Sequence, residues 1–169
     1  MKKISIVSAT SFSNYDLSCK IKKIIEKNDF QCEIINLEDY CLPLFIAKNY
    51  KDSKESVSDV IDDITKKIIG SSGLIFCAPE YNGSIPPIVT NFIAWVSVST
   101  DYWRDAFNNK IGLIASSSGG DAVKYYNAMK SQLEHLGVVV LPRPIIVSSN
   151  KSFKGDSAEK ILLQLRNLL

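Results

Sequence analysis

The segment LIFCA, residues 74–78, is apolar at every position and is followed at once by a proline. A strand buried on both faces of a sheet has this composition, whereas a strand with one solvent face alternates apolar and polar residues. Helices must then cover both faces of the sheet, as they do in α/β proteins with parallel strands. This one segment therefore favours a three-layer α/β fold.

The rest of the chain repeats the alternation of strand and helix. Further strands are predicted at residues 4–7, 32–37, 111–116 and 138–141, the last continuing at 145–147 beyond two prolines. Apolar residues at helical spacing predict helices at residues 17–25, 56–69, 87–98, 122–136 and 157–169. Residues 38–54 are expected to be irregular. We interpret residues 1–169 as a single flavodoxin-like domain with a five-stranded parallel sheet in the order 2-1-3-4-5.

Composition limits the partners and the compartment. The net charge is only +2, which gives little electrostatic support for binding nucleic acid. The apolar runs are shorter than a membrane span, and the N-terminal one turns polar too soon for a signal peptide. Four cysteines without a C-x-x-C pair and a single histidine, His135, indicate no metal site and reduced thiols. We expect a cytoplasmic protein that acts on a small molecule.

In a doubly wound sheet, ligands bind beyond the carboxyl ends of the strands. Three loops are therefore candidate binding segments. The candidate residues are Ser8, Thr10, Ser13 and Asn14 after the first strand, Pro79, Glu80, Tyr81, Asn82, Gly83 and Ser84 after the third, and Ser116, Ser117, Ser118 and Gly119 after the fourth. The chain has neither a G-x-G-x-x-G nor a G-K-[ST] motif, which argues against a Rossmann dinucleotide site and a P-loop.

The chemistry of the first and third loops suggests a phosphorylated, flat ligand. Hydroxyl groups and free N–H groups at a helix N-terminus can hold a phosphate, although the same residue types also cap helices. In the third loop, Asn82 and Gly83 tolerate unusual backbone angles and allow the chain to pass close to a heterocycle. A tight turn without a ligand and, in the fourth loop, a flexible turn are the structural alternatives.

The stretch PEYNGSIPPIVTNFIAWVS, residues 79–97, resembles the NADPH-dependent FMN reductase family, which includes azoreductases, chromate reductases and quinone reductases. The residues that match the family pattern are Pro79, Glu80, Tyr81, Asn82, Ser84, Pro86, Asn91, Trp95 and Ser97. Thr90 and Ala94 depart from it, and a Leu42-Pro43-Leu44 element follows the second strand as in the family. The family's first loop usually carries an arginine toward the phosphate, whereas this chain reads SATSFSN.

The resemblance implies an enzyme in which FMN carries the chemistry and no side chain acts as acid or base. NADPH or NADH would reduce the flavin in a ping-pong cycle, and a quinone, azo compound, chromate or free flavin would oxidise it. The resemblance also implies a homodimer or tetramer, with the Trp95 helix and the loop around Tyr102 and Trp103 near the interface. Two alternatives remain open at this stage, a flavodoxin-type electron carrier and a family member that has lost flavin and acts by protein association.

Several other residues have competing interpretations. His135 is read as a helix-end residue rather than a proton donor, and Cys77 as core packing. Glu80 is expected to cap the next helix or to pair across a subunit interface. Tyr102 and Trp103 are expected in a substrate pocket, at a partner subunit, or anchored on the core.

Overall fold

The strands of the protein form one parallel sheet. A computed structural model describes residues 2–28 and 30–169. The strands are β1 (Lys3–Ser8), β2 (Gln31–Asn36), β3 (Gly73–Cys77), β4 (Ile111–Ser117), β5 (Val139–Val140) and β6 (Ile145–Val147). Their order is β2-β1-β3-β4-β5, with β6 also paired to β4. The predicted flavodoxin-like α/β fold and strand order are confirmed.

The predicted fifth strand is two short strands. Both β5 and β6 run parallel to β4, pairing with its first and last residues respectively. The break contains Pro142 and Pro144, which lack the N–H group that a ladder needs. The sheet therefore has six strands rather than five, although β5 and β6 lie along one edge.

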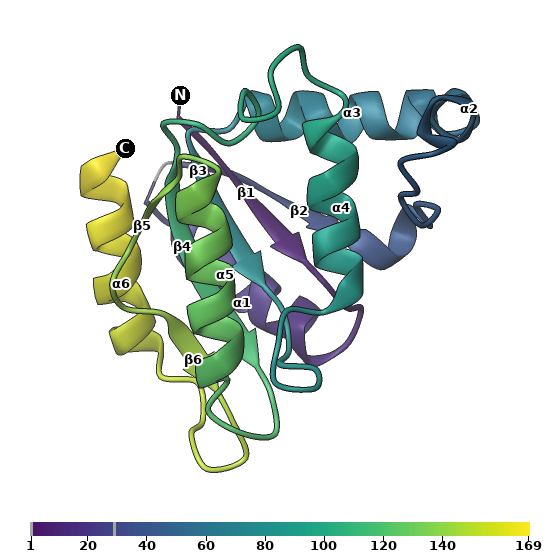
Figure 1. Cartoon of the computed structure of the whole chain (residues 1–169). Coiled ribbons are helices and arrows are strands. Elements are labelled where there is room, and N and C mark those ends of the chain that lie inside the picture. The colour runs from purple at the N-terminus through teal and green to yellow at the C-terminus, as the bar shows by residue number, and fades with distance from the viewer. Residues whose placement is uncertain (1, 29) are drawn as a thin grey trace.

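Helices cover both faces of the sheet (Figure 1). The helices are α1 (Ser13–Glu26), α2 (Tyr50–Glu55), α3 (Ser58–Ile69), α4 (Pro87–Ser97), α5 (Val123–His135) and α6 (Gly155–Leu168), and a short 3-10 helix η1 (Leu37–Asp39) follows β2. One apolar core joins α1 and α6 to the sheet, and the other joins α3, α4 and α5. Every residue of β3 is buried, as its apolar composition predicts.

The two cores account for the apolar stripes of the helices. Leu17, Ile21 and Ile25 of α1 pack with Ile75 of β3 on one face, whereas Phe76 points to the other face. This division follows from the alternation of side chains along a strand. Among the described residues, no helix is both long enough and apolar enough to cross a membrane.

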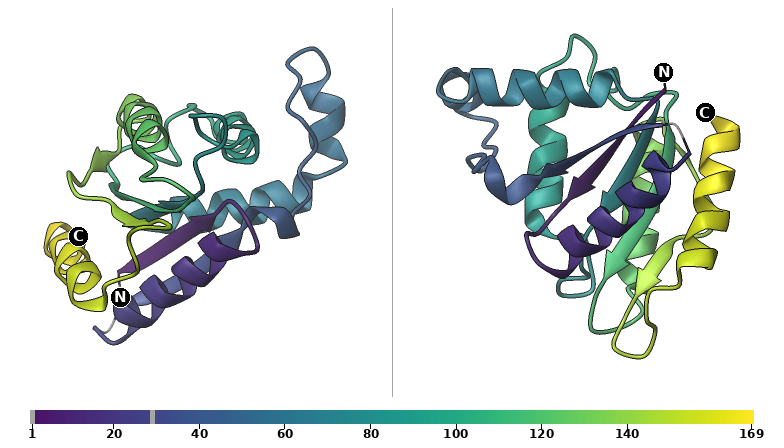
Figure 2. Two further views of the ribbon diagram at one scale, coloured as in Figure 1. Left: turned by 90° about the horizontal axis from the view of Figure 1, so that it is seen from below. Right: turned by 180° about the vertical axis from the view of Figure 1, so that it is seen from behind.

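The stretch that was expected to be irregular, residues 38–54, contains part of η1 and most of α2. We call residues 40–57 the arm, because the segment that carries α2 extends away from the rest of the molecule (Figure 2). The base of the arm is fixed to α4 by Asn91 and Trp95, two of the residues that match the family pattern in residues 79–97. Asn91 donates from Nδ2 to the carbonyl oxygen of Pro43 at 3.0 Å, and Trp95 donates from Nε1 to the same oxygen at 2.7 Å.

Candidate functional site

The three candidate loops meet at the carboxyl edge of the sheet and enclose an open cleft of about 370 Å³. Its lining residues are Thr10, Phe12, Ser13, Asn14, Glu38, Pro79, Glu80, Tyr81, Ser117, Ser118 and Gly119. Most of these residues were candidates from the sequence. Candidates outside this lining set are Ser8, Asn82, Gly83, Ser84 and Ser116. Phe12 and Glu38 line the cleft without having been predicted.

Asn14 joins the first loop to the fourth. Its side chain is buried, its Nδ2 donates to the carbonyl oxygen of Ser117 at 2.9 Å, and its Oδ1 accepts from the Ser117 N–H at 2.8 Å. Beneath it, the Cys77 thiol donates to the carbonyl oxygen of Asn14 at 3.2 Å. Burial raises the pKa of Cys77 to about 12, so the thiol stays protonated at neutral pH. Asn14 therefore shapes the cleft by holding two loops together.

The third loop forms a two-residue hairpin. The Tyr81 N–H donates to the Ser84 carbonyl at 3.2 Å, and the Ser84 N–H donates to the Tyr81 carbonyl at 2.9 Å. The two central residues both have positive φ angles, 50° at Asn82 and 70° at Gly83. Type I′ turns need this geometry, and Asn-Gly is the pair that favours them. The hairpin leaves Tyr81 half exposed at the mouth of the cleft.

Glu80 connects this loop to α5. Its Oε2 accepts from the N–H groups of Lys124 at 2.9 Å and Tyr125 at 3.0 Å, at the N-terminus of that helix. The backbone N–H of Glu80 donates to the Ser118 hydroxyl at 2.7 Å. A carboxylate is favourable there because the first N–H groups of a helix carry partial positive charge. Glu80 does cap a helix, but it caps α5 rather than α4, the next helix in the sequence.

The first loop leads directly into α1, which begins at Ser13. Phe12 occupies the N-cap position, and its phenyl ring cannot accept the hydrogen bonds that Ser, Thr, Asp or Asn would take. Thr10 and Ser13 line the cleft beside the first N–H groups of α1. Ser8 lies under the loop, where its hydroxyl donates to the Thr10 carbonyl at 3.0 Å. Thr10 and Ser13 are thus placed to meet a ligand, whereas Ser8 supports the loop.

The end of β2 contributes an acidic group to the first loop. The Ser11 N–H donates to Oε2 of Glu38 at 2.7 Å, and Nδ2 of Asn36 donates to the Ser11 hydroxyl at 3.0 Å. Asn36 also donates to Oδ1 of Asp39 at 2.9 Å. Sequence reasoning missed these residues because it considered the loops after strands one, three and four. The position of Glu38 just past the carboxyl end of a strand was the signal available.

The fourth loop is held by a second hairpin that the sequence did not bring into the site. Ser148 and Lys151 pair across a tight turn, and the hydroxyl of the intervening Ser149 donates to the Gly119 carbonyl at 2.7 Å. Ser116 is fully buried, and its hydroxyl lies 3.2 Å from that of Ser118. The hairpin after β6, which neighbours β4 in the sheet, therefore holds the fourth loop at Gly119.

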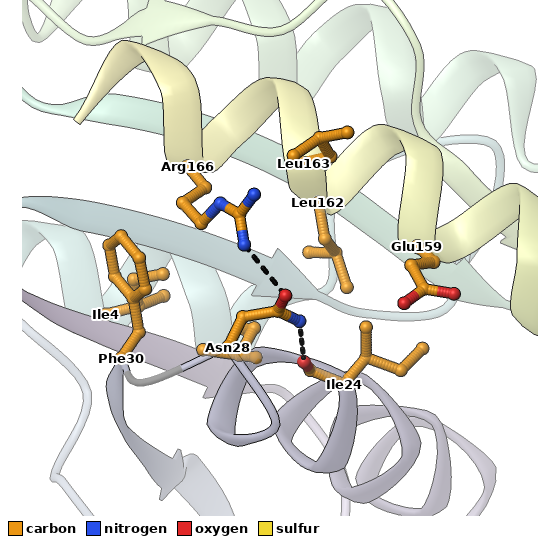
Figure 3. Close-up of a pocket in the computed structure, with 9 residues that line it drawn as sticks. Ile4, Ile24, Asn28, Phe30, Glu159, Leu162, Leu163 and Arg166 are labelled. Atoms are coloured by element: carbon orange, nitrogen blue, oxygen red, sulfur yellow. Dashed lines mark hydrogen bonds between the residues drawn. The ribbon is translucent and has the colours of Figure 1, made fainter.

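A second cavity lies at the opposite end of the sheet, between α1 and α6 (Figure 3). It has a volume of about 230 Å³ and is lined largely by aliphatic residues, with Phe30 at one side. At its rim, Arg166 donates to Oδ1 of Asn28 at 2.7 Å, and Nδ2 of Asn28 donates to the Ile24 carbonyl at 2.8 Å. These bonds tie the C-terminal ends of the two helices together, far from the three loops.

The aromatic pair after α4 also lies away from the cleft. Its loop joins the end of α4 to the start of β4, at the amino edge of the sheet. The Trp103 ring stacks on the His135 ring with centroids 5.2 Å apart, and the Arg104 guanidinium lies 4.4 Å from the Trp103 centroid. Tyr102 and Trp103 therefore do not line the cleft, and of the three interpretations the contacts of Trp103 with His135 and Arg104 favour an aromatic pair anchored on its own chain. His135 is a helix-end residue, as predicted.

Both the doubly wound sheet and the cleft at its carboxyl edge define a flavodoxin-like protein. The family model for NADPH-dependent FMN reductase matches residues 3–152, and the chain therefore belongs to that family. This membership places the protein among the FMN-dependent oxidoreductases. The resemblance carried by the PEYN stretch is confirmed.

Individual relatives agree with this assignment at low identity. The chain is 29% identical over 117 residues to an uncharacterized protein of Mycoplasma pneumoniae, covering 66% of this chain and 68% of that protein. It is 29% identical over 90 residues to the NADH:(hydroxy)cinnamate reductase subunit CrdA of Vibrio ruber, covering 53% of this chain but 40% of the subunit.

Solved structures confirm the fold. FerB, a flavoenzyme NAD(P)H:(acceptor) oxidoreductase of Paracoccus denitrificans, superposes with a TM-score of 0.75 at 20% identity, covering 99% of this chain and 95% of that chain. A flavodoxin from the domain Archaea superposes with a TM-score of 0.67 at 11% identity, covering 99% of each chain. At these identities the superpositions describe the shared fold.

Proposed function

We propose that the protein binds FMN in the cleft between its three loops and uses it to pass electrons from NADPH or NADH to a small oxidant. The proposal rests on one observation: two different structural features, the start of α1 and the third-loop hairpin, border the same cleft. On one side, the start of α1 offers N–H groups next to the hydroxyls of Thr10 and Ser13. On the other side lies the Asn82-Gly83 hairpin, whose first residue, Tyr81, lines the cleft.

The residues present fit the parts of FMN. Helix N–H groups with nearby hydroxyls suit a phosphate, even without a cationic side chain. The tip of the hairpin, at Asn82 and Gly83, suits the polar edge of the flavin ring. Tyr81 and the fourth loop, which line the cleft, suit its flat faces. Asn14 and Glu80 would keep these loops at a constant separation through their bonds to Ser117 and α5.

When bound, FMN supplies hydride and electron transfer, which the side chains of this chain cannot perform. The protein would bind and orient the ring and leave one face open for the nicotinamide and then for the oxidant. A quinone, an azo compound, chromate or a free flavin are the oxidants that the family suggests. Sharing one open face between donor and acceptor corresponds to a ping-pong cycle.

Binding and kinetics test the proposal separately. Titration of FMN into apoprotein should quench flavin fluorescence and raise the melting temperature. With FMN bound, initial rates at varied NADPH and varied soluble quinone should give parallel double-reciprocal lines. Intersecting lines would reject the ping-pong order while leaving flavin binding intact. If high micromolar FMN changed neither fluorescence nor melting, the cleft would not be a flavin site.

We also propose that the protein is a homodimer in the cytoplasm. The arm presents the apolar side chains of Leu44, 72% exposed, and Ile46, 49% exposed, which a second copy would cover. Trp95 is fully buried in its own chain, so its part would be to fix the arm rather than to touch a partner. All four cysteines are free thiols, which suits a reducing compartment. Light scattering should give a mass above the 18.8 kDa of one chain; a monomer mass would contradict the dimer.

A further inference from the structure

Glu38 places a carboxylate on the loop that is expected to hold phosphate. The Ser11 N–H to Glu38 Oε2 distance of 2.7 Å lies in the range of charge-assisted hydrogen bonds. Glu38 lines the cleft together with Thr10 and Ser13. One backbone donor of the first loop is therefore already paired with an anion that belongs to the protein.

The second acidic residue of the cleft has a different position. The carboxylate of Glu80 is turned to the N-terminus of α5, where it accepts from the N–H groups of Lys124 and Tyr125. The charge of Glu80 is thus compensated by helix N–H groups outside the first loop. Glu38 is the carboxylate that a phosphate beside Thr10 and Ser13 would meet.

The surrounding bonds hold Glu38 in register with the loop. Asn36 is at the end of β2, pairs with Ser8 of β1 in the sheet, and donates to the Ser11 hydroxyl at 3.0 Å. Because Asn36 is bonded to Ser11, the chain that follows β2 stays next to the first loop, and the exposed side chain of Glu38 reaches the Ser11 N–H from there. A phosphate in the cleft would compete for the Ser11 N–H and would be repelled by the same carboxylate.

We propose that Glu38 is a specificity-determining residue that weakens the hold of the cleft on the flavin phosphate, so that FMN dissociates faster than it would without this carboxylate. The inference rests on the proposed FMN site. Remaining donors, the hydroxyls of Thr10 and Ser13 and the N–H groups at the start of α1, still favour the phosphate. Glu38 therefore lowers the preference for FMN over riboflavin without abolishing it.

The substitution Glu38→Gln tests this, because glutamine keeps the size and an oxygen that can accept from Ser11 while removing the charge. In low-salt buffer, the FMN dissociation constant should fall by about tenfold and its dissociation rate should slow, since a unit charge next to a dianion repels it substantially even in water. The riboflavin dissociation constant should change by less than about twofold, since riboflavin lacks the phosphate. The control Glu26→Gln makes the same change in net charge at the far end of α1 and should alter neither.

Salt separates a charge effect from a change in loop structure. Added salt should shrink the difference in FMN affinity between the parent and Glu38→Gln, because screening weakens the repulsion. Equal FMN affinities in low salt, or an equal gain for riboflavin, would overturn the role of Glu38 while the FMN site itself stood. Failure of both flavins to bind to both proteins would instead overturn the proposed function, and this inference with it.

Discussion

The side-chain amide of Asn14 holds the backbone of Ser117 from both directions, with a donor bond of 2.9 Å and an acceptor bond of 2.8 Å. The two residues are 103 positions apart in the sequence, and they connect the first turn of α1, directly after the first loop, to the end of β4. Since the cleft lies between loops that β1 and β4 carry, the Asn14–Ser117 pair sets its width.

Replacing Asn14 with alanine should therefore affect both stability and ligand binding. The loss of two buried hydrogen bonds should lower the free energy of unfolding by about 2 kcal/mol, at about 1 kcal/mol for each bond. FMN affinity should fall as well, because the first and fourth loops separate. Asn28→Ala is a matched control, since Asn28 also makes two side-chain bonds but at the opposite end of the sheet. The control should lose stability and keep FMN affinity, and equal losses of affinity would contradict the role of Asn14.

Gly83→Val should damage the hairpin of the third loop. Gly83 has a φ of 70°, and an added Cβ would lie 3.1 Å from Cδ of Lys124. A β-branched residue is strained at this angle, by about 1–3 kcal/mol, and the hairpin should shift to relieve it. FMN affinity measured by fluorescence should fall by at least about tenfold if the turn backbone meets the flavin edge.

The control for this substitution is Gly155→Val, at the start of α6. An added Cβ meets open space there, and the φ angle of Gly155 does not lie in the left-handed region. This variant should bind FMN like the parent. Unchanged FMN affinity in Gly83→Val would show that the hairpin does not contact the flavin.

Thr10→Ala and Ser13→Ala should each weaken FMN binding. Both side chains line the cleft next to the N-terminus of α1, and one hydrogen bond contributes about 1 kcal/mol, or about fivefold in affinity. Riboflavin affinity should not change, because riboflavin has no phosphate for these hydroxyls to bind. Thr90→Ala removes a hydroxyl that bonds to Pro87 on α4 and serves as a control. Parent protein that bound riboflavin and FMN equally well would show that this loop does not hold phosphate.

Glu80→Ala should destabilise α5 and loosen the third loop from it. The carboxylate accepts two helix N–H groups, so its loss should lower the free energy of unfolding in urea by about 1–2 kcal/mol. Glu80→Gln keeps an acceptor oxygen and should recover part of the loss. Glu134→Ala, which removes a side chain paired with Lys130 on the surface of the same helix, should have little effect. Stability unchanged by Glu80→Ala would rule out the capping role.

Alkaline pH should destabilise the protein through Cys77. Burial raises the pKa of its thiol from 9.0 to about 12 in the folded state. Between these values the unfolded state has lost the thiol proton and the folded state keeps it, so stability falls as pH rises. At pH 10, one unit above the unfolded value, the loss from Cys77 should be about 1.4 kcal/mol. Urea unfolding at pH 8 and pH 10 measures it, and Cys77→Ala should show a smaller decrease; an equal decrease would assign the effect elsewhere.

The fold class and the location of the cleft follow from the sequence alone. The fully apolar strand at residues 74–78 predicted a sheet covered on both faces, and parallel strands bring the loops after β1, β3 and β4 to one edge. Asn82 and Gly83 predicted a backbone turn with positive φ angles because few other residue pairs adopt them. These features follow from the residue types and from interactions between residues that are close together in the chain.

Which polar groups in that cleft are available to a ligand depends on contacts between residues far apart in the chain. Asn14 is a plausible phosphate ligand by type, yet its amide is committed to Ser117, and Glu80 caps a helix 44 positions away along the chain. Glu38 reaches the Ser11 N–H only because β1 and β2 are neighbours in the sheet. A side chain bonds to whichever group the fold brings within about 3 Å. The spacing of residues along the sequence does not contain that information.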